Sequence, residues 1–390
     1  MTGTTSLRGM TWDHPRGTGP VRAATAIWAQ SHPEVAVTWD VRPLRAFEDQ
    51  PITELSASYD LLMIDHPHIG AAVAEDALLG LDEWIENDFL REQEDHATGA
   101  SFESYAYGGR QWALAVDAAA QVGAYRADLL ARLGAELPRT WDDVAALARD
   151  SSGAKARLLL PLNPTHAWCT VLSIVESQRQ GELRTETQWA EAFAQALEIL
   201  AALTPHLDPR SERLDPIAAG QLATTTDQVL GIPLAFGYVT FARTGVDRQR
   251  CLTHVDAPRG DAGIGSVLGG VGLALSARSS RPDLAAELAR LVASPEFQSN
   301  DVVEAGGQPG HRSAWIDPQL DETTNHFFSA TIDSLDAAFV RPRDAGAAAV
   351  QRKAGDTVHE KIWRDSTSTV TCARQLGRLM AEPDQNKERA

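Results

Sequence analysis

Short apolar runs alternate with segments of helical spacing through the first part of the chain. Residues 10–12 end one apolar run, residues 35–39 are rich in β-branched and aromatic side chains, and residues 59–65 form a continuous apolar run. Such a run is typical of a strand buried on both faces. Residues 21–30 and 44–55 show the spacing of helices with one apolar face. This β-α-β-α-β order predicts a parallel, doubly wound sheet with right-handed crossovers.

The same alternation continues towards the C-terminus. A strand is predicted over residues 112–116 and ends at Asp117, and residues 263–276 are glycine-rich and then strand-like. Thr140 is expected to cap a helix with two acidic residues in its first turn, which suits the helix dipole. The spacing of apolar residues predicts further helices over 125–133, 188–203, 284–292, 323–339 and 345–363.

The composition is that of an ordinary globular protein with more than one compact unit. At 390 residues the chain is long enough for two units with their own cores. No stretch approaches the roughly 18 apolar residues of a membrane-spanning helix, so no direct membrane insertion is expected. The net charge of −18 argues against a nucleic acid partner, because phosphate binding needs concentrated lysine and arginine. Three cysteines do not suggest a disulfide framework.

The N-terminal sequence bears on localisation. A secretory signal needs a basic start, roughly 7–15 apolar residues and a small-residue cleavage site. Residues 1–17 (MTGTTSLRGMTWDHPRG) do not provide this pattern. The sequence as written therefore predicts a cytoplasmic protein. If an export sequence has been removed, the expected location is the periplasm or the outside of the cell.

Two polar loops follow directly after predicted strands. In a doubly wound sheet, ligands bind in the crevice outside the carboxyl ends of the strands. We therefore expect both loops to contact a ligand. Their candidate residues are Trp12, Asp13, His14 and Arg16 in the first loop, and Asp65, His66 and His68 in the second.

These loops offer several kinds of chemistry. Arg16 is the candidate for holding an anionic group, since its planar guanidinium offers two parallel hydrogen bonds to a carboxylate or phosphate. Asp13 would take a ligand hydroxyl, or would cap the next helix in a solvated loop. The second loop, with two histidines beside a carboxylate, could hold zinc or iron, contact a ligand or cap a helix. We expect ligand contact there and no metal.

Short motifs follow the predicted elements in a fixed order across most of the chain. They are DLLMIDHPHIG (60–70) with LLGLD (78–82), WALAVDAAAQVGAYRADLL (112–130), PRTWDDVA (138–145), GSVLGGVGLALS (265–276), SPEFQ (294–298) and GQPGHR (307–312). In this order they resemble motifs of the extracellular solute-binding proteins that serve ABC transporters, in particular the sugar-binding branch of that family.

The resemblance implies a periplasmic-binding-protein-like α/β fold of two lobes. Each lobe would be a doubly wound sheet flanked by helices, and a hinge would let the cleft between them close. The first lobe would comprise residues 1–113 and about 250–315. The second would comprise residues 114–249 and about 316–390.

Further candidates for the cleft come from the elements near the hinge and in the second lobe. Asp117 would contact the ligand after its strand, unless it caps a helix. His166 and Cys169 could form a base and a nucleophile, although a free cysteine is more often simply buried. Glycine pairs let backbone amides approach a ligand. The remaining candidates are Gln121, Asn163, His166, Trp168, Tyr238, Gly269 and Gly270.

Together, these features predict a protein that binds a small polar organic ligand in a closing interlobe cleft, as a solute-binding protein does. The ligand is expected to be an organic acid or a polyol or sugar. The alternative is a cytoplasmic enzyme on the same fold, with the histidine loops doing acid–base or metal-assisted chemistry. No cofactor is expected. The expected partners are the small-molecule ligand and the membrane components of an ABC transporter.

Overall fold

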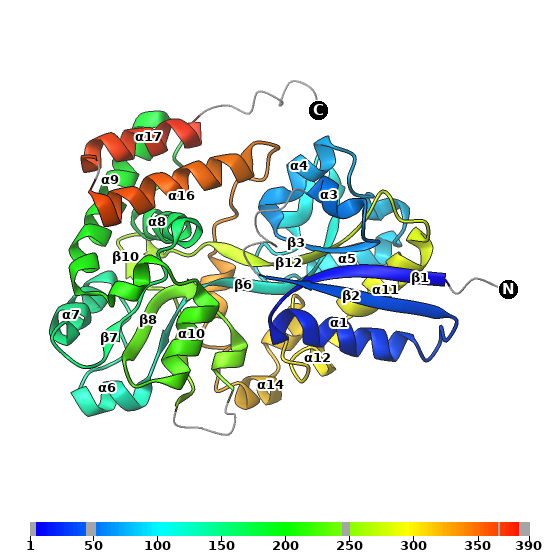
Figure 1. Cartoon of the computed structure of the whole chain (residues 1–390), viewed down its shortest axis with the longest axis horizontal. Helices are drawn as coiled ribbons and strands as arrows, with labels where there is room; N and C mark the ends of the chain where they lie inside the picture. Colours follow the sequence, from blue (N-terminus) through cyan, green and yellow to red (C-terminus); the bar gives the residue numbers. More distant parts are fainter. Residues whose placement is uncertain (1–4, 44–51, 244–249, 366, 382–390) are drawn as a thin grey trace.

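Two bodies of helices lie at the two ends of a central sheet (Figure 1). The computed structural model describes residues 5–43, 52–243, 250–365 and 367–381. The strands are β1 (Thr5–Trp12), β2 (Val35–Arg42), β3 (Leu61–Ile64), β4 (Ala106–Tyr107), β5 (Arg110–Gln111), β6 (Ala113–Tyr125), β7 (Arg157–Leu158), β8 (Val229–Phe236), β9 (Thr253–Val255), β10 (Arg259–Gly260), β11 (Gly263–Ile264) and β12 (Leu268–Leu275).

Helices cover the sheet at both ends. The α-helices are α1 (Pro15–Trp28), α3 (Ile52–Ser56), α4 (Ile69–Ala74), α5 (Asn87–Asp95), α6 (Ala127–Leu133), α7 (Trp141–Ser151), α8 (Pro164–Gln178), α9 (Glu186–Leu203), α10 (Pro216–Thr225), α11 (Pro282–Ala293), α12 (Pro295–Asn300), α13 (Arg312–Trp315), α14 (Pro318–Thr323), α15 (Ile332–Asp336), α16 (Ala347–Arg364) and α17 (Thr369–Ala381). Short 3₁₀ turns are η1 (His66–His68), η2 (Leu81–Glu83), η3 (Glu103–Tyr105), η4 (Thr204–His206), η5 (Pro209–Glu212) and η6 (Val239–Phe241).

The main sheet has the strand order β2-β1-β3-β12-β6-β8-β7, and β9 pairs with β6. β1 runs parallel to β2 and β3, as the alternation of strands and helices predicts. β12 is antiparallel to both β3 and β6, and β6 is antiparallel to β8. The two long antiparallel strands therefore connect a parallel β-α-β unit at one end of the sheet to a smaller set of strands at the other.

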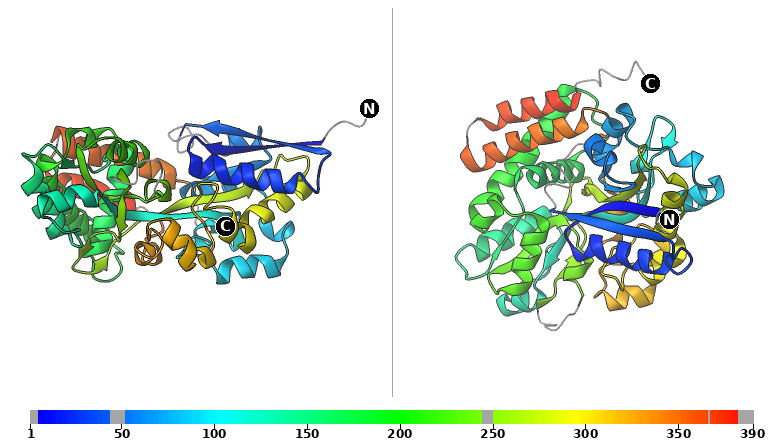
Figure 2. Two further views of the ribbon diagram at one scale, coloured as in Figure 1. Left: turned by 90° about the horizontal axis from the view of Figure 1, so that it is seen from below. Right: turned by 45° about the vertical axis from the view of Figure 1, so that its right-hand side comes forward.

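Two large hydrophobic clusters give the two ends of the molecule separate cores. One contains buried residues between Leu7 and Val116 and between Val271 and Val302. The other contains buried residues from 125–267 and 354–379. We call the two bodies lobe 1 and lobe 2. Figure 2 shows them side by side, with β6 and β12 running between them. The residue boundaries expected for the lobes stay a prediction.

The strand expected to stop at Asp117 continues to Tyr125, so this prediction was wrong. All 13 residues of β6 are buried, because the strand passes between the two lobes and is paired along both edges. Asp117 therefore lies inside a strand and caps no helix, which also rules out that alternative role. The sequence prediction failed because aspartate is rarely buried unless it is paired, and its partner Arg16 is distant in the sequence.

Other element boundaries also differ from the expectations. α6 begins at Ala127 and not at residue 125, because Tyr125 is still part of β6, where it pairs with Gly231 of β8. No single helix covers 323–339, since Asn325 and His326 adopt left-handed backbone angles (φ 53° and 59°) between α14 and α15. Part of the helix expected over 44–55 lies outside the described residues, and only α3 is seen. The cap at Thr140 is confirmed: its Oγ accepts a hydrogen bond from the Asp143 amide.

Among the described residues, no helix combines the length and the apolar character that crossing a membrane requires.

Candidate ligand-binding cleft

A cavity of about 70 Å³ lies between the two lobes. Its walls come from the ends of β1 and β3 in lobe 1, the middle of β6 and β12, and α8 and β8 in lobe 2, as expected for ligand binding at the carboxyl ends of strands. The lining residues are Trp12, Arg16, Asp65, Ala119, His166, Pro216, Phe236, Tyr238, Gly270, Val271 and Arg341.

Arg16 joins three parts of the cleft. Its Nε donates to Asp117 Oδ2 at 2.6 Å, and its Nη2 makes a second bond to Asp117 Oδ1. Its Nη1 donates to the carbonyl of Gly237 in lobe 2 at 2.7 Å, and the guanidinium lies 4.6 Å from the Tyr238 ring centre. The two-bond fork expected to hold a ligand anion is thus taken by a carboxylate of the protein itself.

The first turn of α1 explains how Arg16 is placed. His14 is the N-cap, and its Nδ1 accepts a hydrogen bond from the Arg16 amide at 3.1 Å. Asp13 is exposed and does not cap this helix, so that alternative was wrong. Burial, and secondly the nearby Arg16 charge, lower the pKa of His14 to about 4. A neutral His14 ring packs edge-on against Tyr238, with 4.9 Å between ring centres.

Asp65 forms the second buried ion pair of the cleft. Nη2 of Arg341 donates to both of its carboxylate oxygens, at 3.0 and 2.8 Å. Burial acts to raise the pKa of Asp65, but the Arg341 guanidinium and the His66 ring outweigh it and hold that pKa well below its usual range. Arg341 also lies over Phe236, 5.9 Å from the ring centre. Asp65, which lines the cavity, and Asp117, which lies behind Arg16, are therefore each paired with an arginine.

The two histidines of the second loop do not line the cavity. His66 is fully buried, and its Nδ1 lies 3.2 Å from Asp65 Oδ1 without hydrogen-bond geometry. Burial, followed by the Arg341 charge, lowers the pKa of His66 to about 4. His68 is half-buried in the turn η1. Within the described part of the chain, these histidines and Asp65 do not bring three ligand atoms together as a metal site would require.

His166 is a polar residue of the cavity wall whose ring has no hydrogen-bond partner among the described residues. Its amide is capped by Asn163 Oδ1 at 3.1 Å, which fixes the first turn of α8. The ring lines the cavity and packs edge-on against Phe236 at 6.0 Å. Burial, and secondly Arg341, lower its pKa to about 3, so the ring is neutral at pH 7. Neither ring nitrogen has a hydrogen-bond partner within the described residues, although the residue is buried.

Three other candidates lie away from the cavity. Trp168 is buried in the core of lobe 2 against Phe193, with 5.5 Å between ring centres. Gln121 is buried within β6, where its side chain accepts a hydrogen bond from Ser173. Cys169 also belongs to the core of lobe 2, which leaves the pairing of His166 with a nucleophilic cysteine without support.

The glycine pair at the start of β12 shapes the floor of the cavity. Gly270 has a φ of 109°, and a Cβ there would lie 2.3 Å from the Asp117 carbonyl oxygen. A Cβ on Gly269 would lie 2.7 Å from the Phe236 ring. Gly270, which lines the cavity, is therefore required for the close approach of β12 to β6, whereas Gly269, which does not line it, leaves room for the Phe236 ring.

Several lining residues were not expected from the sequence. Arg341 lies 276 positions from its partner Asp65, in the segment between α15 and α16, and no local pattern singles it out. Phe236 is the last residue of β8, and the apolar run around it is equally typical of a strand in the hydrophobic core. Only the fold brings these side chains to the cavity.

The two lobes, the strands between them and the cavity at their junction define a bilobal α/β fold. Residues 13–157, a little over a third of the chain, match the family model of bacterial extracellular solute-binding proteins. No curated protein matches the sequence.

Solved structures share the fold over nearly the whole chain. Maltose-bound MalE3 of T. maritima superposes with a TM-score of 0.80 at 17% identity, covering 96% of this chain and 100% of the other. The tagatose-bound ABC transporter solute-binding protein of Thermotoga lettingae superposes with a TM-score of 0.81 at 14% identity, covering 96% of this chain and 100% of the other. The GacH receptor of Streptomyces glaucescens superposes with a TM-score of 0.78 at 19% identity, covering 97% of each chain. The resemblance to extracellular solute-binding proteins and the two-lobed α/β fold, both expected from the sequence, are confirmed.

Proposed function

We propose that the protein binds an uncharged sugar or polyol in the cleft between its lobes. The observation that carries the proposal is the unpartnered ring of His166, a buried neutral imidazole that lines the cavity. Buried polar groups are almost always hydrogen-bonded, so this ring needs a partner from a ligand or from water. A hydroxyl group suits it, because a hydroxyl both donates and accepts.

The charges of the cleft favour a neutral ligand over an organic acid. Its two arginines each face an aspartate, Arg16 with Asp117 and Arg341 with Asp65. An anionic ligand would have to compete with these carboxylates for the guanidinium groups, whereas a hydroxylated ligand can hydrogen-bond to the outer edges of both pairs. Of the two ligand classes expected from the sequence, polyols and sugars therefore fit better.

Aromatic side chains supply the apolar part of the site. Trp12, Phe236 and Tyr238 line the cavity from both lobes. Ligand sites typically combine such surfaces with a few polar groups that fix orientation. The apolar C–H faces of a sugar or polyol would pack against these rings. Structural neighbours of the chain were solved with ribitol, with tagatose and with mannitol, which supports this ligand class.

Binding without turnover is supported over the enzyme alternative. An acid–base catalyst works best with a pKa near the operating pH. The pKa values of His14 and His66 are lowered to about 4 and that of His166 to about 3, which keeps all three neutral and poorly basic at pH 7. We further propose that the protein acts outside the cytoplasmic membrane and passes its ligand to the membrane components of an ABC transporter, as the family match suggests.

Calorimetry with a panel of sugars, polyols and organic acids tests the proposal. We expect at least one neutral hydroxylated compound to bind and organic acids not to bind. His166→Ala should weaken binding about tenfold, the usual size of one hydrogen bond. His254→Ala is the matched control, because His254 is equally buried and packs edge-on against Phe327 but does not line this cavity. Preferential binding of acids, or equal losses in both variants, would overturn the proposal.

A further inference from the structure

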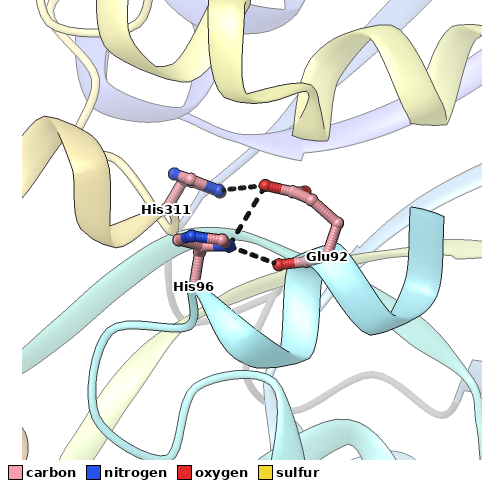
Figure 3. A group of neighbouring side chains, drawn as sticks. All are labelled: Glu92, His96 and His311. Carbon is pink, nitrogen blue, oxygen red and sulfur yellow. Dashed lines mark hydrogen bonds and ion pairs between the residues drawn. The ribbon is translucent and has the colours of Figure 1, made fainter. Parts of the chain in front are cut away.

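Two histidines and a glutamate meet on lobe 1, away from the cleft (Figure 3). Glu92 and His96 lie four residues apart at the end of α5, and His311 comes from the segment just before α13. Among the described residues, these three form the group of His, Cys, Asp or Glu side chains whose ligand atoms all lie within 4.8 Å of one another. None of the three lines the cleft cavity.

The distances within this group suit a small metal ion. Glu92 Oε1 lies 2.9 Å from His311 Nε2 and 3.4 Å from His96 Nδ1. Four ligands in a tetrahedron at about 2.0–2.1 Å from zinc are about 3.3 Å from one another. The two glutamate–histidine distances are within a few tenths of an ångström of this value, and all three ligand atoms lie within 4.8 Å of one another. The two imidazole rings are stacked 5.3 Å apart, and the Nδ1 of His96, whose side chain is 56% exposed, also lies 3.1 Å from the Glu92 carbonyl oxygen, a contact that it would exchange for the ion.

The backbone holds the two halves of the group together. The Arg312 amide donates to the His96 carbonyl at 2.8 Å, and Ala97 forms a β-bridge with His311. The position of His311 therefore does not depend on its side-chain contact with Glu92.

A second set of contacts orients the His311 ring. Its Nδ1 accepts a hydrogen bond from the Ser313 amide at 3.3 Å and lies 2.7 Å from Ser313 Oγ, and that hydroxyl lies 2.8 Å from Ser299 Oγ. Metal-binding histidines usually donate a hydrogen bond from their other ring nitrogen, so binding an ion through Nε2 would require Nδ1 of His311 to carry the ring proton and donate it to Ser313 Oγ. The side chain of His311 is only 3% exposed. The positive charge of the adjacent Arg312 is offset by its ion pair with Asp336.

We propose that Glu92, His96 and His311 bind one divalent transition-metal ion, with zinc as the best fit. Two imidazoles and a carboxylate are ligands that zinc prefers, whereas calcium and magnesium prefer oxygen ligands alone. Glu92 and His96 are partly open to solvent, so water would complete the coordination.

The ion would link α5 to the segment that leads to the hinge. Upstream of His311 in that segment, Gln308 accepts a hydrogen bond from the Val239 amide in lobe 2 and donates one to the Ala118 carbonyl in β6. Metal binding would therefore fix the lobe 1 end of a segment that contacts both lobes.

Zinc calorimetry on protein stripped with EDTA and dialysed tests this site. We expect one zinc ion per chain, and visible absorption bands of tetrahedral cobalt when Co²⁺ is used as the probe. His96→Asn and Glu92→Gln change partly exposed side chains, so both variants should fold. Each should lower zinc affinity by more than the roughly 10–100-fold typical of losing a supporting hydrogen bond.

His326→Asn is the matched control, since His326 is an exposed histidine beside Asp321 without a second histidine. It should leave zinc binding unchanged. The absence of saturable zinc binding in the wild type would overturn the proposal. So would binding that survives both substitutions at Glu92 and His96, or that is lost equally in His326→Asn. Sugar or polyol binding should not depend on any of these variants.

Discussion

Arg16 and Asp117 are separated by 101 positions in the chain and meet in a buried, two-bond ion pair, in which Arg16 lines the cleft cavity and Asp117 does not. Their side chains are 4% and 6% exposed. Burial raises the pKa of the Asp117 carboxyl, and the Arg16 guanidinium offsets only part of that rise. Because Arg16 also binds the Gly237 carbonyl, this pair connects α1 of lobe 1, the strand β6 and lobe 2.

Removing one partner of this pair is expected to cost stability. Arg16→Ala leaves the Asp117 charge buried and uncompensated, which typically costs about 3–5 kcal/mol in the free energy of unfolding. Urea denaturation of the variant measures this loss. The double variant Arg16→Met with Asp117→Leu should recover most of it, because no charge is then left unpaired. If Arg16 is instead an anion clamp, Arg16→Ala will fold with normal stability and lose only the binding of acids.

The buried histidines should make the protein sensitive to mild acid. The pKa of His166 is about 3 in the folded protein, against about 6.5 for a free histidine, and burial is the main cause. The unfolded chain therefore binds more protons between these values, so the free energy of unfolding falls as the pH drops below about 6.5. The loss attributable to this histidine should be on the order of 1–3 kcal/mol by pH 4.

A variant isolates the contribution of His166 to this acid sensitivity. His166→Gln cannot take up a proton, so its unfolding free energy should fall less between pH 7 and pH 4 than that of the wild type. Chemical denaturation at several pH values gives both curves. Parallel curves would mean that His166 does not titrate on unfolding in this range.

The floor of the cleft should not tolerate a side chain at Gly270. Its φ of 109° disfavours any other residue, and a Cβ would lie 2.3 Å from the Asp117 carbonyl oxygen. Gly263 is a matched control with a φ of 111° and no heavy atom within 4 Å of a Cβ. Gly263→Ala should cost roughly 1–2 kcal/mol from backbone strain alone. Gly270→Ala should cost clearly more in thermal or urea unfolding and should also weaken ligand binding. Equal costs would show that β6 and β12 separate easily.

Local chemistry made parts of this fold predictable. The buried run of β3, the parallel unit around β1 and the capping box at Thr140 all depend on residues close together in sequence. The cleft was predictable only in outline, because its loops follow strands at the expected edge of the sheet. The remaining features of the cleft depend on contacts between residues far apart in the sequence. Asp117, for example, is expected to end a strand unless its distant partner Arg16 is known.

The same limit applies to the histidines. A Glu-x-x-x-His pair at residues 92–96 is visible in the sequence, but His311 joins it only through the fold. His66 and His68, which are more conspicuous, lie next to the cavity without lining it. Residue types indicated the available chemistry, while their burial and orientation depended on contacts between distant segments.

The two lobes are expected to approach each other when ligand binds. β6 and β12 both run between the lobes, and the segment after α15 adds a further connection, where Phe339 pairs with Ser266 and Leu268. Several short crossings of this kind allow hinge closure, in which each lobe moves as a rigid body. Small-angle scattering should show a smaller radius of gyration in the presence of a saturating sugar or polyol identified by calorimetry. His166→Ala at the same ligand concentration should show a smaller decrease, because less of the variant is occupied. An unchanged scattering profile for the fully occupied wild type would mean that the cleft binds its ligand without closure.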